Sequence, residues 1–229
     1  MSKSTSSGAV CNDCAGRSGC PVYTGSEFSA PQPASSTPAI SVIAGINPGH
    51  QHGVEYDQAD LLILTKALDV DLGPGPLAFD EHHDRAISKA IAASDFRGAA
   101  RAHLAIAIPA VSARASDASR HIVVIGLGKA DRVTRRSVCD VFADALNFAC
   151  QFKSQSLLLP IFPQRSSEGT INLRGTGAIL RCLVDEKVRR GALGQLKEIC
   201  LLCAPQAKRH LQDGLVVERI LCGTCRRPD

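Results

Sequence analysis

Three stretches decide the fold: RHIVVIGLGKADRVTRRSV at residues 120–138, SLLLPIFP at 156–163 and EGTINLRGTGAILRC at 168–182. The first two begin with short apolar runs, which are typical of buried strands. The first and third contain a glycine-rich turn that leads into a helical pattern. Such a turn presents unpaired backbone N–H groups, and the positive end of the helix dipole favours phosphate there. The pattern predicts an anion or nucleotide site.

The rest of the chain continues the alternation of apolar runs with amphipathic segments, which predicts right-handed crossovers in a three-layer α/β/α domain with a mixed sheet. Strands are predicted from Ile40, from Ala59 and at 103–111, 121–128, 156–163, 196–203 and 216–222. Helices are predicted at 79–94, 132–152, 178–190 and 204–215.

Composition divides the 229 residues into three parts and sets the class of protein. Residues 1–38 predict a flexible Ser/Pro-rich arm, 39–217 one α/β domain, and 218–229 a cysteine-containing tail. The hydrophobic fraction of 45% supports a core, while the net charge of +4 is dispersed and aromatics reach only 4%, which disfavours nucleic acid. No apolar run is long enough for a membrane span and no secretory signal is visible, so we expect a cytoplasmic protein with reduced cysteines.

The two glycine turns are the candidate ligand site. Gly126-Leu127-Gly128-Lys129 is neither a Walker A loop nor a complete dinucleotide fingerprint. In Arg174-Gly175-Thr176-Gly177, two glycines let the backbone curl into a nest, Thr176 adds a hydroxyl donor and Arg174 adds a charge-assisted contact. The ligand-binding hypothesis therefore names Gly126, Gly128, Arg174, Gly175, Thr176 and Gly177. A tight structural turn is the alternative at both places.

The order of these pieces resembles a known family. DFRG at 95–98, an alternating strand, VVIGLGK and a basic helix are similar to the N-terminal domain of leucyl aminopeptidases, which has a macro-domain-like fold. SLLLPIFP, RGTGAIL, EICLLCAP and AKRHLQ resemble the closing half of a macro domain, including its phosphate-binding glycine loop. The resemblance covers roughly residues 40–215 and implies binding of ADP-ribose or a related nucleotide.

Three departures from this family bear on ligand binding and catalysis. Gly45-Ile46-Asn47 lacks the acid with which a macro domain holds adenine, and LLILTKAL at 61–68, without any Asn, stands where hydrolytic macro domains carry an Asn-rich segment. The metal-binding carboxylates and Lys of an aminopeptidase's catalytic half have no counterpart. We therefore expect no peptidase activity, and the missing groups favour a protein that is not an enzyme.

The ten cysteines suggest one metal site. Cys200 and Cys203 lie three apart on a predicted strand and so face opposite ways, which makes them core cysteines, as are Cys139, Cys150 and Cys182. The CNDC and CGTC turns can place four thiolates around a structural zinc, and their cysteines are Cys11, Cys14, Cys222 and Cys225. Free thiols in two loose tails are the alternative, and no cofactor is required. The cluster at 80–84, DEHHD, is predicted to be a solvated first helical turn.

These observations predict a non-catalytic domain that binds a phosphate-bearing small molecule, either a nucleotide or an ADP-ribose-like metabolite. A protein-interaction or regulatory module, with a protein partner or a second copy of the chain, is the first alternative. An ADP-ribosyl hydrolase is the second.

Overall fold

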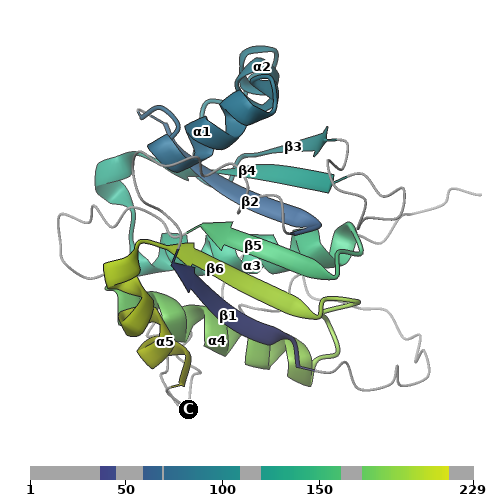
Figure 1. Cartoon of the computed structure of the whole chain (residues 1–229), viewed down its shortest axis with the longest axis vertical. Coiled ribbons are helices and arrows are strands. Elements are labelled where there is room, and N and C mark those ends of the chain that lie inside the picture. The colour runs from purple at the N-terminus through teal and green to yellow at the C-terminus, as the bar shows by residue number, and fades with distance from the viewer. Residues whose placement is uncertain (1–36, 45–58, 69, 109–119, 161–171, 217–229) are drawn as a thin grey trace, which may run out of the picture.

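The structure is a computed structural model, and it describes residues 37–44, 59–68, 70–108, 120–160 and 172–216. Six strands form one sheet, in the order β1-β6-β5-β2-β4-β3 (Figure 1). The first five strands in that order are parallel, and β3 pairs antiparallel with β4 at the edge. The strands are β1 (Ala39–Ala44), β2 (Leu61–Ala67), β3 (His103–Ile108), β4 (Arg120–Gly128), β5 (Ser156–Pro160) and β6 (Glu198–Cys203).

Helices cover both faces of the sheet, which confirms the predicted three-layer α/β/α architecture. The helices are α1 (Pro74–His82), α2 (Ala86–Ala92), α3 (Arg135–Gln151), α4 (Leu173–Arg189) and α5 (Lys208–Val216), with short 3-10 turns η2 (Ala130–Arg132) and η3 (Pro205–Ala207). In β2 the apolar residues alternate between the faces: Leu61 and Ile63 pack with α3, α4 and α5, while Leu62 and Leu64 pack with α1 and α2. A run of apolar residues is needed because both faces are buried.

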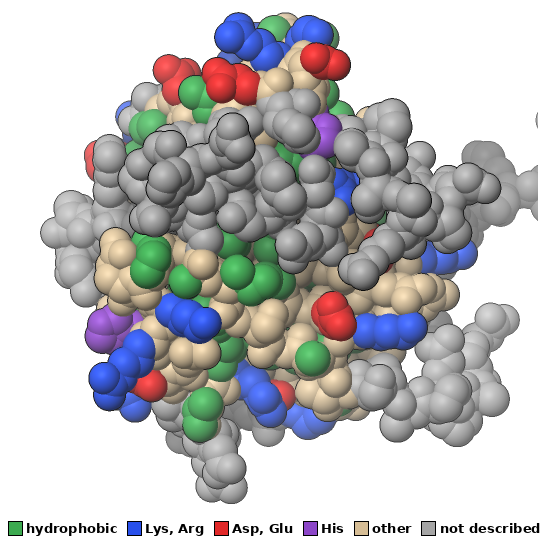
Figure 2. All heavy atoms as spheres, viewed as in Figure 1, with side chains coloured by type: hydrophobic (Ala, Val, Ile, Leu, Met, Phe, Trp, Pro, Cys, Tyr) green, Lys and Arg blue, Asp and Glu red, His purple; other side chains and the backbone are tan. Residues whose placement is uncertain are grey.

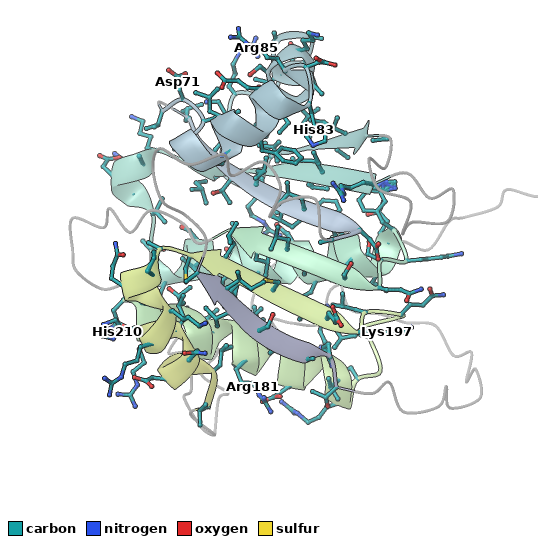
Figure 3. The ribbon with its side chains drawn as sticks, in the orientation of Figure 1. Asp71, His83, Arg85, Arg181, Lys197 and His210 are labelled. Atoms are coloured by element: carbon teal, nitrogen blue, oxygen red, sulfur yellow. The ribbon has the colours of Figure 1, made fainter. Side chains whose placement is uncertain are left out.

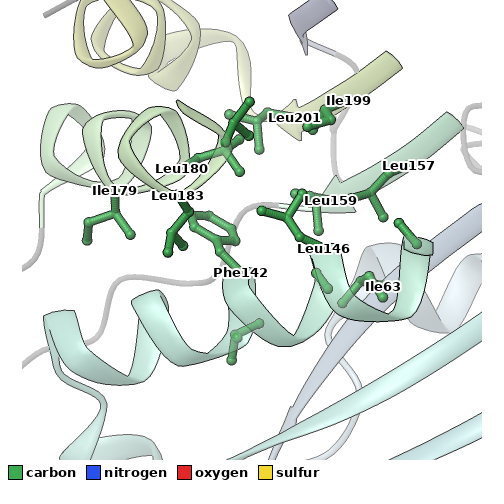
Figure 4. Close-up of a cluster of buried hydrophobic side chains, with 14 of the residues drawn as sticks. Ile63, Phe142, Leu146, Leu157, Leu159, Ile179, Leu180, Leu183, Ile199 and Leu201 are labelled. Carbon is green, nitrogen blue, oxygen red and sulfur yellow. The ribbon is translucent and has the colours of Figure 1, made fainter. Parts of the chain in front are cut away.

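The larger core lies between the sheet and α3, α4 and α5 (Figure 4). Phe142 of α3 and Leu183 of α4 meet sheet residues such as Leu159 there. Thr134 starts α3 as its N-cap, and its Oγ1 accepts the Ser137 N–H while the Ser137 hydroxyl accepts the Thr134 N–H. The 3.6-residue periodicity predicted this helix correctly, to within three residues of its start.

The predicted helix at 79–94 is wrong in detail. The chain forms α1 and α2, separated by Asp84 and Arg85 in the left-handed region (φ 54° and 57°). α1 begins at Pro74, five residues before the predicted start. Proline is favoured in the first helical turn because its missing N–H would have no partner there.

Asp80 was expected in a solvated turn, but it is fully buried. Its carboxylate accepts the N–H groups of Ile87, at 2.7 Å, and Ser88, and also the Ser88 hydroxyl. A carboxylate against the first turn of a helix satisfies N–H groups that have no partner within the helix. Asp80 therefore joins the two helices that cover one face of the sheet.

We predict that Asp80→Asn lowers the free energy of unfolding by about 1–2 kcal/mol, because hydrogen bonds to a charged acceptor weaken when the charge is removed. Urea unfolding measures the change. The matched control is Glu81→Gln, at an exposed neighbouring position, which should change stability by less than about 0.5 kcal/mol. Equal effects of the two variants would contradict a capping role for Asp80.

The cysteines are placed largely as expected. Cys203 is buried on the α3–α5 side of the sheet and Cys200 packs on the other side, which confirms that the two thiols face opposite ways. Cys139 is buried, Cys182 is half-buried and Cys150 is exposed, so Cys150 is a correction to the predicted core.

Among the described helices, none is both long and apolar enough to cross a bilayer.

Candidate functional site at the carboxyl edge of the sheet

The direction in which successive strands are added across the sheet reverses between β5 and β2. These two strands are parallel neighbours, with Leu61 opposite Leu157. From β5 the chain continues through α4 to β6 on one side, and from β2 it continues through α1 and α2 to β3 on the other. The helices lie on opposite faces of the sheet. In open α/β sheets, ligands bind in the crevice outside the carboxyl ends of the strands at such a point.

The first turn of α4 forms one side of this edge. Asn172 is the N-cap: its side-chain oxygen accepts the Gly175 N–H at 2.6 Å, and its carbonyl accepts the Thr176 N–H at 2.9 Å. The Arg174–Gly177 quartet therefore lies inside the helix, which corrects the expectation of a nest ahead of it. The N–H groups of Leu173 and Arg174 have no helical carbonyl to bond. They are the donors that the helix directs toward the edge.

The four residues of this quartet have different surroundings. Arg174 is exposed and Gly175 is half-buried, whereas Thr176 and Gly177 are buried. The Thr176 hydroxyl donates to the Asn172 carbonyl at 3.1 Å. A Cβ at Gly177 would lie 2.5 Å from the Leu211 carbonyl oxygen, so this glycine lets α4 approach α5. Arg174 and Gly175 are the members that lie nearest to solvent.

Gly126 and Gly128 lie at the same edge, at the end of β4, with the end of β2 beside them. Their N–H groups are both used, since Gly126 donates to the Ala102 carbonyl at 2.7 Å and Gly128 to the Gly98 carbonyl at 2.9 Å. The structure thus brings both glycine groups to one edge, and it fixes Gly126 and Gly128 against the 98–102 segment.

Basic residues follow the ends of three parallel strands. Lys129 comes directly after β4, Arg174 follows β5 in the first turn of α4, and Lys208 follows β6 at the start of α5. In Figure 2, Lys and Arg side chains lie on the left, where the parallel strands end in Figure 1, and also at the top and right of the molecule. In Figure 3, Asp71, which follows β2, and His210 of α5 lie toward the side at which the parallel strands end. Fixed positive charge around a crevice attracts anionic ligands.

Two residues at this edge were missed from the sequence. Of the two, only Asn172 has a signal in the sequence, because Asn is a favoured N-cap residue and it stands three positions before Gly175 in the first turn of α4. Lys66 interrupts an apolar strand, and its ammonium group donates to the carbonyls of Ala67 at 3.0 Å and Val70 at 2.9 Å. It holds the chain as it leaves β2, and no motif in the sequence indicates that.

Cys203, which ends β6, is not activated as a nucleophile. Burial raises the pKa of its thiol, and the nearby Lys208 only partly opposes this. The thiol is therefore protonated at neutral pH, and the thiolate is the reactive form.

In the part of the chain that the structure describes, no three His, Cys, Asp or Glu residues are grouped as metal ligands would be. The proposed zinc ligands Cys11, Cys14, Cys222 and Cys225 lie outside the described residues, as do most of the predicted arm and the tail.

Comparison with known proteins places this geometry in a structural class. No protein-family model and no curated protein matches the sequence. Among solved structures, the macro domain of ganglioside induced differentiation associated protein 2 matches with a TM-score of 0.53, 10% identity, and coverage of 77% of this chain and 82% of that one. A Trypanosoma brucei macrodomain in complex with ADP matches with a TM-score of 0.53, 11% identity, and coverage of 77% and 68%.

A mutant of tomato leucine aminopeptidase matches with a TM-score of 0.52 and 17% identity over 79% of this chain. The chain spans 36% of the length of that enzyme. At these identities the likeness concerns the fold, and it agrees with the strand order and layers described above. The chain has a macro-domain-like α/β/α fold, shared with part of a leucine aminopeptidase.

Proposed function

We propose that this protein binds a phosphate-bearing small molecule, a nucleotide or an ADP-ribose-like metabolite, without changing it chemically. The observation that carries the proposal is the position of the first turn of α4. This turn, with the exposed Arg174, follows β5 at the point where the connections from β5 and β2 leave to opposite faces of the sheet. The fold shared with a macrodomain in complex with ADP supports the same class of ligand.

Each part of the edge has a role that its chemistry supports. The N–H groups of Leu173 and Arg174 and the helix dipole hold the phosphate oxygens. The guanidinium of Arg174 adds a bidentate, charge-assisted contact. Gly126 and Gly128 line the neighbouring wall, and the basic groups of Lys129 and Lys208 raise the local concentration of the anion.

Titration calorimetry of the full chain with ADP-ribose, ADP and AMP tests this proposal. We expect a dissociation constant between about 1 µM and 1 mM, which corresponds to about −8 to −4 kcal/mol. Arg174→Ala should weaken binding about tenfold or more, because a charge-assisted contact is lost. The control is Arg181→Ala on the same helix, which removes an ion pair with Asp185 and should leave affinity unchanged.

The outcome also separates the alternatives. Absence of heat with all three ligands, or equal effects of the two arginine variants, would contradict the proposed site. Chromatography of the recovered ligand and of an ADP-ribosylated protein substrate tests the chemistry. Release of ADP-ribose from that substrate would support the hydrolase alternative in place of pure binding.

A further inference from the structure

The outer edge of β3 offers backbone groups for pairing. Along β3, His103 lies opposite Ile125 and Ala105 opposite Val123. In an antiparallel pair, residues alternate between bonding the partner strand and pointing away from it. Because the Gly126 N–H bonds the Ala102 carbonyl, the N–H and C=O groups of His103, Ala105 and Ala107 point away from β4. Among the described strands, only β4 pairs with β3.

Helix α3 packs beside the start of β3. The His103 ring contacts the Phe148 ring edge-on, with centroids 5.0 Å apart, so odd-numbered β3 side chains face α3. Ala105 and Ala107 are exposed and small, which leaves room over the strand next to Phe148 and Phe152, whose rings stack 6.1 Å apart. The even-numbered Leu104 and Ile106 pack on the opposite face.

A cavity of about 290 Å³ lies between the start of β3 and α3. Five residues line it: Arg101, His103, Asp144, Asn147 and Phe148. The guanidinium of Arg101 lies 3.7 Å from the Asp144 carboxylate, yet its side chain is 67% exposed. Arginine has five N–H donors, so this ion pair leaves donors for a ligand.

Two more donors line the cavity. The Oδ1 of Asn147 accepts a hydrogen bond from the Lys187 ammonium at 2.8 Å, which leaves the Asn147 NH₂ group as a donor. The imidazole of His103 is exposed and donates through a ring N–H. Asp144 is the single acid, and it already faces Arg101, although burial raises the pKa of its carboxyl group. The cavity therefore suits a group that only accepts hydrogen bonds.

We propose that an extended peptide adds to β3 as an antiparallel strand and places its C-terminal carboxylate in this cavity. A strand antiparallel to β3 runs from Ala107 toward His103, so its last residue arrives beside Arg101. Main-chain bonds to β3 supply affinity, and the side chains next to the carboxylate pack on Phe148. The site adjoins Gly126 at the end of β4, whose carbonyl accepts the Arg101 N–H, but it includes no residue of α4 and does not depend on the nucleotide proposal.

The test uses an acetylated heptapeptide, Ser-Val-Thr-Val-Thr-Val-Val, with either a free C-terminal carboxylate or a C-terminal amide. Each peptide is added, up to about 1 mM, to the full chain labelled with ¹⁵N, and NMR spectra record the amide signals. This peptide concentration still detects weak binding. The acid form should shift the amide signals of His103, Ala105 and Ala107, and should bind at least tenfold more tightly than the amide form. Arg101→Gln should abolish this preference without affecting binding of the amide form.

A backbone variant tests the strand addition itself. Ala105→Pro removes an N–H that points away from β4 and would bond the peptide, so it should abolish binding of both peptides. The fold should persist, because an edge strand tolerates proline where the N–H faces outward. Ala105→Ser keeps the N–H and is the control, and thermal unfolding of both variants reports whether the fold persists. Equal affinity for acid and amide forms, binding by a folded Ala105→Pro variant, or no shifts at about 1 mM would overturn the proposal.

Discussion

Replacing Gly126 with alanine is expected to lower the free energy of unfolding by about 3 kcal/mol or more, the upper end of the cost of overpacking a core. A Cβ at this position would overlap the Ala99 carbonyl oxygen and lie 2.7 Å from the Gly98 carbonyl carbon. Nonbonded carbon atoms prefer about 3.5–4.0 Å. The obstacle is backbone, so no side-chain rotation relieves it.

The segment that obstructs the new methyl group cannot simply move away. Gly126 donates its N–H to the Ala102 carbonyl at 2.7 Å and accepts the Arg101 N–H at 3.0 Å. Relief of the overlap would break these two bonds and shift the start of β3. Urea unfolding measures the loss.

Gly73→Ala is the matched control for this experiment. A Cβ there meets only the Pro76 ring, at 4.0 Å, and the residue has an extended backbone with φ −63°. The same substitution should change stability by less than about 1 kcal/mol. If Gly126→Ala unfolds no more readily than Gly73→Ala, the close approach of the 98–102 segment to β4 is contradicted.

The central strands β2, β4 and β5 were predicted well because they are buried on both faces. In LLILTKAL, HIVVIGLG and SLLLP, nearly every residue must be apolar, and a run of that kind stands out against the polar segments around it. β2 and β5 fall within those runs, and β4 starts one residue before its run, at Arg120. The expected strand at 216–222 lies almost wholly outside the described residues.

The break between α1 and α2 could not be read from the sequence. The pattern from Phe79 to Ser94 fits one helix, and the polar run DEHHD fits its exposed turn. What decides the break is a tertiary contact: the buried Asp80 carboxylate bonds the N–H groups of Ile87 and Ser88, which requires α2 to start anew. Propensity carries no information about such a contact.

The candidate site was predicted in part for a related reason. Gly126, Gly177 and their neighbours stand out as glycine turns, and the structure does bring both groups to the carboxyl edge of the sheet. The sequence shows only that a side chain is absent, and not whether a ligand or another backbone takes its place. At Gly126 and Gly177 that place is taken by backbone, from Ala99 and Leu211 respectively.

Gly214→Ala is the second substitution with a large expected effect, and here two physical effects have opposite signs. Helix propensity alone favours alanine over glycine by about 1 kcal/mol. However, a Cβ at Gly214 would overlap the Arg174 carbonyl oxygen and lie 2.9 Å from its carbonyl carbon. An overpacking cost of about 3 kcal/mol exceeds the propensity gain, so we expect a net loss of about 2 kcal/mol.

The same substitution reports on the proposed ligand site, because the obstructed carbonyl belongs to the first turn of α4. Displacing that turn should weaken binding of ADP-ribose, as Arg174→Ala should, but with a loss of stability that Arg174→Ala lacks. Asp213→Ala, at an exposed neighbouring position, is the control and should change neither quantity appreciably. If Gly214→Ala instead raises the melting temperature, propensity outweighs packing and the close approach of α5 to α4 is contradicted. If it lowers stability but leaves nucleotide affinity intact, the first turn of α4 does not hold the phosphate.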